Sequence, residues 1–452
     1  MRRTVIEPIT IWDGHDTVLS RGRLVIDDTT ITALQRSDEP LDNPPSVGPV
    51  RRIDGDGKLA LPGLICCHTH LYSALARGLA VPDYAPSTFA EILEQLWWRL
   101  DKALDANTLR ASAQIGAMEA ARCGITTLVD HHASPNAIPG SLDVVRDEVV
   151  ERVGLRGAFC YELSDRDGPE RSRQGIRENV RFLEMIADTP SNVAGHFGLH
   201  ASFTVDDETL DAVASALPDG IGVHIHVAEG PEDEAQCEAV HGQRIIDRLD
   251  RYGLLRPRSI LAHCLHLTEQ EKDRVGERDA IVVHNPRSNM NNAVGTFDLD
   301  GFLDRGILTG LGTDGLGANL LAELFTAALL QKHTRGDSLA GGFDRLDALL
   351  FRNNPRIAER LFGVPFGRLA PGTPADVVLL DYAAPTPLTA DTILGHLLFG
   401  VAVHSLRVSD VLVGGRCILR EGSFADIDEQ AAYAHANEQA ERLWSRVRSE
   451  VE

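Results

Sequence analysis

Short apolar runs alternate with longer segments of helix-like spacing between about residues 59 and 366. Strands that alternate with helices form parallel sheets, because each helix carries the chain back to start the next strand. Eight strands with eight crossovers are typical of an α/β fold, the (β/α)8 TIM-like barrel, whose active sites lie where the strands end. The eight predicted strands are residues 60–66, 125–130, 155–161, 194–200, 222–227, 260–263, 280–284 and 308–314.

Both chain ends show a different pattern, with short strands of alternating polarity. They lie within the first 58 residues and after a turn-rich segment that covers residues 367–376. We therefore predict a barrel over residues 59–366 and one small β-sandwich domain, discontinuous in sequence, over residues 1–58 and 367–452. An amphipathic surface helix is expected at about residues 428–451.

Histidines follow several of the predicted strands. His68 and His70 end the first strand, and residues two apart on a strand share a face, so both imidazoles can reach one cation. A pair of this kind also occurs as hydrogen-bonded core residues. In the fifth strand we prefer His226, nearer the strand end, as a ligand, and place His224 deeper as a packed residue. Asp314 ends the eighth strand; alone it fits a turn, but beside three histidines it supplies an oxygen ligand.

The composition narrows the class of protein. The chain has 66 acidic and 44 basic residues and a net charge of -22, which disfavours nucleic acid and membrane surfaces as partners. The first residues lack the apolar core of a signal peptide. Seven scattered cysteines without CxxC spacing indicate reduced thiols, so we expect a cytoplasmic protein.

Five motifs occur in an order that resembles the amidohydrolase superfamily, in its aminohydrolase and chlorohydrolase branch, and the match covers essentially the whole chain. They are residues 61–70, 226–229, 261–264, 312–315 and 371–376. Three further segments look most similar to the SsnA subgroup of aminohydrolases, whose substrate this resemblance does not settle. They are residues 96–101, 130–135 and 284–292.

The resemblance implies roles for the matching residues: His68, His70, His226 and Asp314 as metal ligands, Glu229 and His263 as proton-handling residues, and His200 as a substrate contact. These roles agree with the chemistry, since a divalent cation lowers the pKa of bound water from about 15.7 toward about 7. Asp314 can take the proton of that water and pass it to a leaving amine, Glu229 can protonate a ring nitrogen, and His263 can stabilise developing charge. A plain core histidine is the alternative for His263.

The lysines bear on the number of metal ions. Dinuclear members of the superfamily bridge two ions with a carboxylated lysine at the end of the fourth strand, whereas this chain has its lysines elsewhere, at positions 58, 102, 272 and 332. We therefore expect one divalent ion. Zinc suits three nitrogens and one oxygen, and Fe(II) is the alternative.

The predicted function is that of a metal-dependent hydrolytic deaminase, which releases ammonia from an amino-substituted nitrogen heterocycle. The same site would suit a chlorohydrolase or alkylaminohydrolase of triazine-like rings or a cyclic amide hydrolase, and the fold alone could serve as a non-catalytic scaffold. Trp98 or Trp97 can stack on the ring or merely pack, and Asn289 can bind substrate or form a turn. We expect that one of His131 and His132 orients a ligand and the other faces solvent. The resemblance implies a homodimer.

Overall fold

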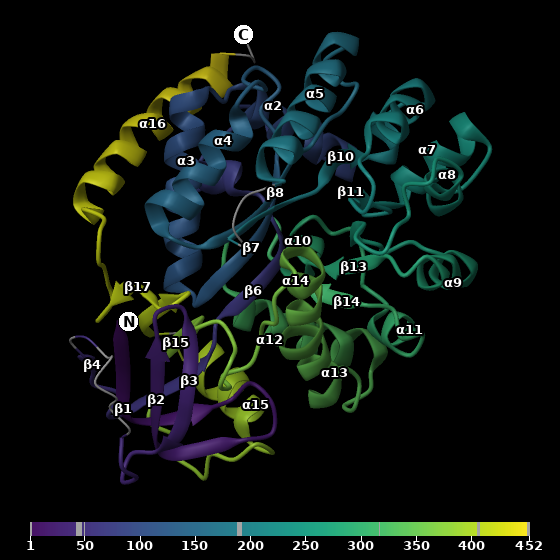
Figure 1. Ribbon diagram of the computed structural model, residues 1–452. Helices are drawn as coiled ribbons and strands as arrows, with labels where there is room; N and C mark the ends of the chain where they lie inside the picture. The colour runs from purple at the N-terminus through teal and green to yellow at the C-terminus, as the bar shows by residue number, and fades with distance from the viewer. Residues whose placement is uncertain are drawn as a thin grey trace.

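The computed structural model describes residues 2–41, 48, 50–187, 192–315, 317–404 and 407–449. A barrel of parallel strands forms its centre, as predicted (Figure 1). One ladder joins β6, β7, β8 and β9, and a second joins β10 to β14 in chain order. The strands are β6 (Leu64–Thr69), β7 (Ile125–His132), β8 (Arg156–Tyr161), β9 (Val193–Gly195), β10 (Phe197–Ala201), β11 (Val223–Val227), β12 (Ile260–His263), β13 (Ile281–His284) and β14 (Thr309–Leu311).

Two connections turn these ladders into a closed barrel. The predicted fourth strand is divided at His196 into β9 and β10, which link the two ladders. At the other seam the backbone N–H groups of Thr313 and Asp314 donate to the carbonyl of His68, at 2.9 and 3.1 Å. Strands β6, β7 and β8 are buried along their whole length, as expected for parallel strands covered by helices on the outside.

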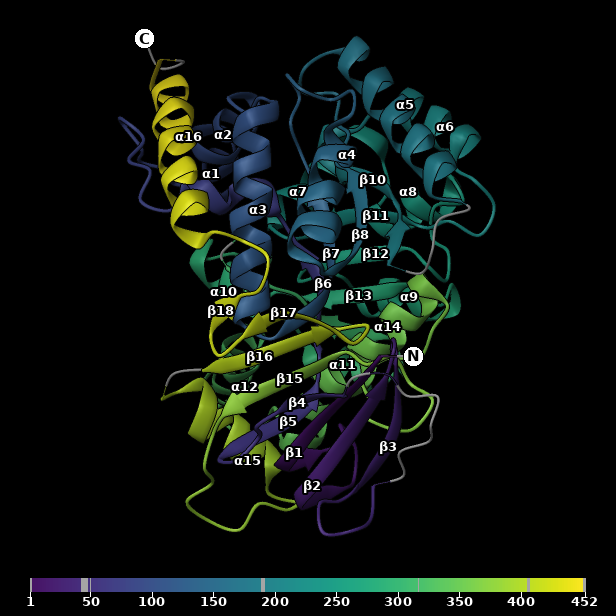
Figure 2. The same cartoon turned by 60° about the vertical axis from the view of Figure 1, so that its left-hand side comes forward.

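The outer ring of the barrel consists of helices that follow the strands (Figure 2). Short helical segments, α1 (Phe89–Ile92) and α2 (Trp98–Lys102), lie between β6 and α3. The other helices are α3 (Ala106–Arg122), α4 (Ser141–Arg146), α5 (Pro169–Ile186), α6 (Asp207–Ala216), α7 (Pro231–His241), α8 (Ile245–Arg251), α9 (Glu269–Glu277), α10 (Pro286–Asn291), α11 (Leu299–Leu303), α12 (Leu320–Arg335), α13 (Phe343–Asp347) and α14 (Asn354–Phe362).

The two chain ends meet in one nine-stranded mixed sheet below the barrel (Figure 2). Its order is β18-β17-β16-β15-β5-β1-β2-β3, with β4 paired to β1, and it has a hydrophobic core of its own that includes Ile6, Leu24 and Val377. Helix α15 (Ile393–Gly395) follows β15. The strands are β1 (Arg3–Trp12), β2 (Val18–Asp27), β3 (Thr30–Arg36), β4 (Val50–Ile53), β5 (Lys58–Pro62), β15 (Val377–Asp381), β16 (Val408–Val413), β17 (Arg416–Arg420) and β18 (Ser423–Phe424).

The run predicted as the first barrel strand, residues 60–66, spans two strands. Its first part is β5, which pairs with β1 and β15 in the lower sheet, and its second part is β6 of the barrel. Gly63 lies between them, where a Cβ atom would come within 2.1 Å of Thr126 Oγ1. The chain therefore passes from one sheet to the other at a position that only glycine can occupy.

Helix α16 (Glu429–Ser449) corresponds to the predicted C-terminal helix, and residues 450 and 451 of that prediction lie outside the described residues. It lies along α3 of the barrel rather than on the lower sheet (Figures 1 and 2). Leu443 and Val447 are buried, and the indole N–H of Trp444 donates to the carbonyl of Leu75 at 2.7 Å. None of the helices in the described part of the chain is long and apolar enough to span a membrane.

A buried ion pair joins the base of the barrel to the lower sheet. Arg156 Nε lies 2.9 Å from Asp376 Oδ2, and both side chains are less than 10% exposed, at 6% and 8%. Removing one partner of a buried pair leaves the other charge unpaired, at a cost of about 3–5 kcal/mol. We expect Asp376→Ala to lower the free energy of unfolding by about that amount, measured from urea unfolding. The exposed Asp381→Ala is the control, and equal midpoints for the two variants would contradict the expectation.

Candidate active site

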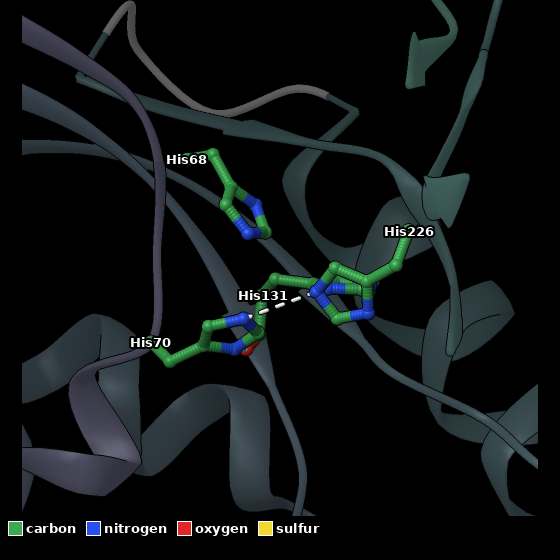
Figure 3. Close-up of side chains that lie close together, drawn as sticks. All are labelled: His68, His70, His131 and His226. Carbon is green, nitrogen blue, oxygen red and sulfur yellow. Dashed lines mark hydrogen bonds between the residues drawn. The ribbon is translucent and has the colours of Figure 1, made fainter. Parts of the chain in front are cut away.

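Four predicted ligands converge at the ends of β6, β11 and β14. His70 Nε2 lies 3.1 Å from His226 Nε2 and 3.1 Å from Asp314 Oδ1, and His68 Nε2 lies 3.6 Å from the same carboxylate oxygen. Figure 3 shows the rings of His68, His70 and His226 turned toward one another. The three strands bring together residues that are as much as 246 positions apart in sequence, since residue 68 lies in the first barrel strand and residue 314 follows the last one.

The electrostatics of this group favour a cation. Burial opposes ionisation of Asp314, but the facing imidazoles of His68 and His70 hold its pKa well below the usual range. Burial lowers the pKa of His70, but the carboxylate of Asp314 outweighs it and raises the pKa to about 9. Burial also lowers the pKa of His68, whose Nε2 has no hydrogen-bond partner. Three imidazole nitrogens beside one ionised carboxylate fit a divalent metal ion.

A second layer of contacts fixes the orientation of these side chains. His70 Nδ1 donates to the carbonyl of His131 at 2.5 Å, and Ser288 Oγ donates to Asp314 Oδ2 at 2.5 Å. His68 Nδ1 shares a hydrogen bond of 2.8 Å with His224 Nε2. His224 is thus fully buried behind His68, whereas His226 lines the cavity. Contacts of this kind orient ligands and tune their basicity.

Glu229 and His263 lie on the other side of Asp314. Glu229 Oε2 is 3.4 Å from His263 Nε2, and Glu229 Oε1 accepts a hydrogen bond of 3.2 Å from Asn292. Burial and the nearby charge of Asp314 raise the pKa of Glu229 well above its usual range, which favours the protonated form of this carboxyl group. It can therefore act as an acid beside an ionised carboxylate.

The tautomer of His263 follows from its neighbour. Asn289 Nδ2 donates to His263 Nδ1 at 2.7 Å, and burial lowers the pKa of His263 to about 3, so the ring is neutral and its proton is on Nε2. That Nε2–H faces the carboxyl groups of Glu229 and Asp314, at 3.4 and 3.8 Å. His263 can thus donate a hydrogen bond into the site.

Several residues of the site have left-handed backbone conformations that side chains other than glycine rarely adopt. The φ angles are +46° at Ala228, +75° at His263 and +54° at Asp314. Such conformations cost about 1–3 kcal/mol each and cluster at functional sites. Here they occur at the ends of β11, β12 and β14, where the chain turns to present Glu229, His263 and Asp314.

One cavity adjoins the convergent ligands. Trp97 and Trp98 contribute to its wall, and the guanidinium of Arg166 lies over the Trp98 ring, 4.7 Å from its centre. The other polar side chains that line it are His70, Ser73, Asp101, Glu162, His200, His226, Glu229, Asp233, Ser288, Asn292 and Asp314.

Comparison with known proteins identifies the family to which the chain belongs. The model of the amidohydrolase family matches residues 59–417. The chain belongs to the amidohydrolase family. A 5'-deoxyadenosine deaminase of Methanothermobacter thermautotrophicus is 31% identical over 421 residues, which cover 91% of this chain and 92% of the relative. A 5-methylthioadenosine/S-adenosylhomocysteine deaminase of Pelotomaculum thermopropionicum is 29% identical over 455 residues, covering 99% and 100%.

Solved structures agree with this assignment. An adenosine deaminase from Xanthomonas campestris with bound zinc superposes with a TM-score of 0.82 at 24% identity, and the match covers 98% of each chain. The comparison supports the same fold for this amidohydrolase, a barrel with a sheet formed by both chain ends. The chain is therefore a hydrolase of the class that acts on carbon–nitrogen bonds other than peptide bonds. The more specific SsnA resemblance stays a prediction.

The amidohydrolase site differs from the sequence-based expectation at two histidines. We expected either His131 or His132 to face solvent, but both are fully buried, so this expectation is wrong. His131 stacks on His224, with ring centres 4.4 Å apart, and His132 Nε2 lies 2.8 Å from Ser134 Oγ. Strand β7 runs on through His132, and consecutive strand residues point to opposite faces, so His131 lies among the site histidines while His132 is buried against Tyr161.

Two polar residues have places that the sequence did not indicate. Asn289 binds His263 and does not line the cavity. Two other residues of the same segment, Ser288 and Asn292, do line it. Glu162 lines the cavity, although no prediction included it. Glu162 directly follows β8, so its position as a carboxylate at a strand end could have indicated a place in the site.

Proposed function

We propose that this amidohydrolase is a metal-dependent hydrolytic deaminase of an amino-substituted nitrogen heterocycle, with ammonia as product. The observation that carries the proposal is that Glu229 and Asp314 line one cavity, where His263 Nε2 lies 3.4 Å from a Glu229 oxygen and 3.8 Å from an Asp314 oxygen. Deamination of a ring needs both an acid for a ring nitrogen and a base for the attacking water. The named deaminases among the relatives support the same reaction class.

His68, His70, His226 and Asp314 would hold one zinc ion, since three nitrogens and one oxygen form a donor set that zinc prefers. Bound there, zinc would act as a Lewis acid and lower the pKa of water from about 15.7 toward about 7. Fe(II) tolerates the same ligands and is the alternative. A single ion agrees with the end of β10, which carries His200 where a bridging lysine would be needed.

The chain's own residues would move the protons. Asp314 takes a proton from the attacking water while Glu229 gives its proton to a ring nitrogen, so that the ring carbon accepts the oxygen. The Nε2–H of His263 stabilises the oxygen at the carbon that becomes tetrahedral. Asp314 then passes its proton to the departing amine, the carbon–nitrogen bond breaks, and the ring nitrogen returns its proton to Glu229.

His200 and Trp98 would contact the ring, because both line the cavity. Their rings lie edge to face, with centres 6.2 Å apart. Asn289 would act through His263, which it holds in the donating tautomer, and a direct contact between Asn289 and substrate stays a prediction of the sequence alone.

The reaction is tested by incubating the metal-loaded enzyme with adenine, guanine, cytosine, adenosine derivatives, aminopterins and aminotriazines in ¹⁸O-labelled water. A deaminase releases ammonia and places one ¹⁸O at the former amine carbon. Release of halide or alkylamine from triazine-like rings would favour the chlorohydrolase or alkylaminohydrolase alternative. Opening of cyclic amides alone would contradict deamination, and no turnover with full metal content would favour a scaffold.

From the sequence we also propose a domain division at residues 58/59 and 366/367, a homodimer and a cytoplasmic location. Light scattering of the purified protein checks the dimer, and limited proteolysis at residues 367–376 checks the second domain boundary. Because a small neutral ring is the expected partner, we expect phosphorylated nucleotides to be poor substrates of a chain with a net charge of -22.

A further inference from the structure

One wall of the cavity contains a buried carboxyl group to which the proposed reaction gives no role. Glu162 is 4% exposed, lines the same cavity as Glu229, and its Oε2 has no hydrogen-bond partner among the described residues. Buried polar atoms in proteins are nearly always hydrogen-bonded. Oε2 is enclosed beside His70 and His131, so the oxygen that faces His200 and can bind a ligand is Oε1.

The neighbours of Glu162 do not satisfy it. His131 Nδ1 and His70 Nδ1 lie 3.5 and 3.7 Å from Oε2, and His70 already donates this N–H to the carbonyl of His131. The guanidinium of Arg166 is held elsewhere, by Asp101 at 2.9 Å. The imidazole rings of His70 and His131 therefore surround Glu162 on one side, and its carboxyl group lines the cavity.

The tautomer of His200 adds a second acceptor. The hydroxyl of Thr204 donates to the carbonyl of Ala201 at 3.1 Å, so its oxygen accepts from His200 Nδ1 at 2.7 Å. Burial keeps the pKa of His200 well below its usual value, so the ring is neutral and Nε2 bears a lone pair. This lone pair lies 3.6 Å from Glu162 Oε1, too far for a hydrogen bond. When this carboxyl oxygen acts as an acceptor, the two acceptors are close enough for one donor group to reach both.

An amino group next to a ring nitrogen has the required chemistry. It is planar and carries two N–H donors, one for each acceptor. A carboxyl group can bind such an edge in either protonation state: when neutral it accepts from the amino group and donates to the ring nitrogen, and when ionised it accepts from a protonated ring edge.

We propose that Glu162 and His200 bind a second amino group of the substrate, distinct from the amine that leaves, so that this enzyme selects diamino-substituted nitrogen heterocycles. The inference rests on the proposed function for the identity of the leaving group. According to this inference, Glu162 determines the selectivity between rings that differ only at the edge remote from the attacked carbon.

The test compares matched rings: 2,6-diaminopurine with adenine, and 2,4-diaminopyrimidine with 4-aminopyrimidine. For the wild-type enzyme we expect kcat/KM to be about 10- to 100-fold higher for the diamino member of each pair, because a hydrogen bond to a buried acceptor is lost in the other. Glu162→Leu should reduce the preference to within about threefold, whereas Glu162→Gln, which keeps an acceptor and a donor, should retain most of it. The surface variant Glu170→Gln is the matched control.

Metal content separates recognition from a structural role. It should stay at the wild-type level in Glu162→Leu; metal loss would show that Glu162 positions His70 or His131 instead and would overturn the inference. The inference would also be overturned if Glu162→Leu kept the preference for diamino rings. It would be overturned as well if the wild-type enzyme showed no such preference, and that test needs no folded variant. Calorimetric measurement of the binding of the same ring pairs distinguishes this inference from the proposed deaminase function. If diamino rings bind more tightly but are not turned over, the inference is supported and the deaminase function is contradicted.

Discussion

Glu229→Gln is expected to abolish most turnover while leaving the bound metal in place. Glu229 is buried, and burial and the charge of Asp314 raise its pKa, which favours the acid form that can protonate a ring nitrogen. Glutamine keeps the hydrogen bond with Asn292 but has no proton to transfer. General acids contribute about 10²- to 10⁴-fold to the rate, and we expect a loss of kcat in that range, measured by ammonia release.

Glu232 offers a matched control for this variant. It lies three residues further along, is exposed, and belongs to the first turn of α7, so Glu232→Gln should retain normal turnover. Elemental analysis of both variants should find the wild-type amount of metal. A Glu229→Gln enzyme within a few-fold of wild type on the true substrate would remove Glu229 from the mechanism.

Much of the fold could be predicted from the sequence because parallel barrel strands are buried on both faces and read as apolar runs. His68 and Asp314 could be assigned to one site for the same reason: strand ends of a barrel meet at one rim, whatever their separation in sequence. The division of residues 60–66 into β5 and β6 could not be predicted, because an apolar run continues through both strands. Only the contact of Gly63 with Thr126 shows where the chain changes sheets.

The sequence could not predict roles that depend on a side chain's contacts with other residues. Four asparagines follow β13 within residues 285–292, and nothing in their spacing shows that Asn289 holds His263 while Asn292 reaches Glu229. The same limit applies to Glu162, whose importance follows from the oxygen that faces His200 and from the tautomer of His200. Hydrogen-bond geometry, rather than residue type, decides these cases.

His226→Ala is expected to remove both bound metal and activity, because it deletes one of four proposed ligands at the position 3.1 Å from His70 Nε2. His224→Ala should give a smaller loss. Its Nε2 holds His68 Nδ1 at 2.8 Å, and partners of this kind contribute about 10- to 100-fold to metal affinity. The two residues lie on the same strand face, two positions apart, so the comparison separates a ligand from the group that orients one.

The measurement is a zinc titration of chelator-treated protein against a competing indicator, together with elemental analysis of protein purified without added metal. The exposed His435→Ala on α16 is the control and should bind zinc as the wild type does. Wild-type protein should hold one ion per chain, and two ions at full occupancy would contradict the single site. Equal losses of affinity in the His224 and His226 variants would mean that His226 is not the ligand, since removal of a ligand must weaken binding more than removal of the residue behind it.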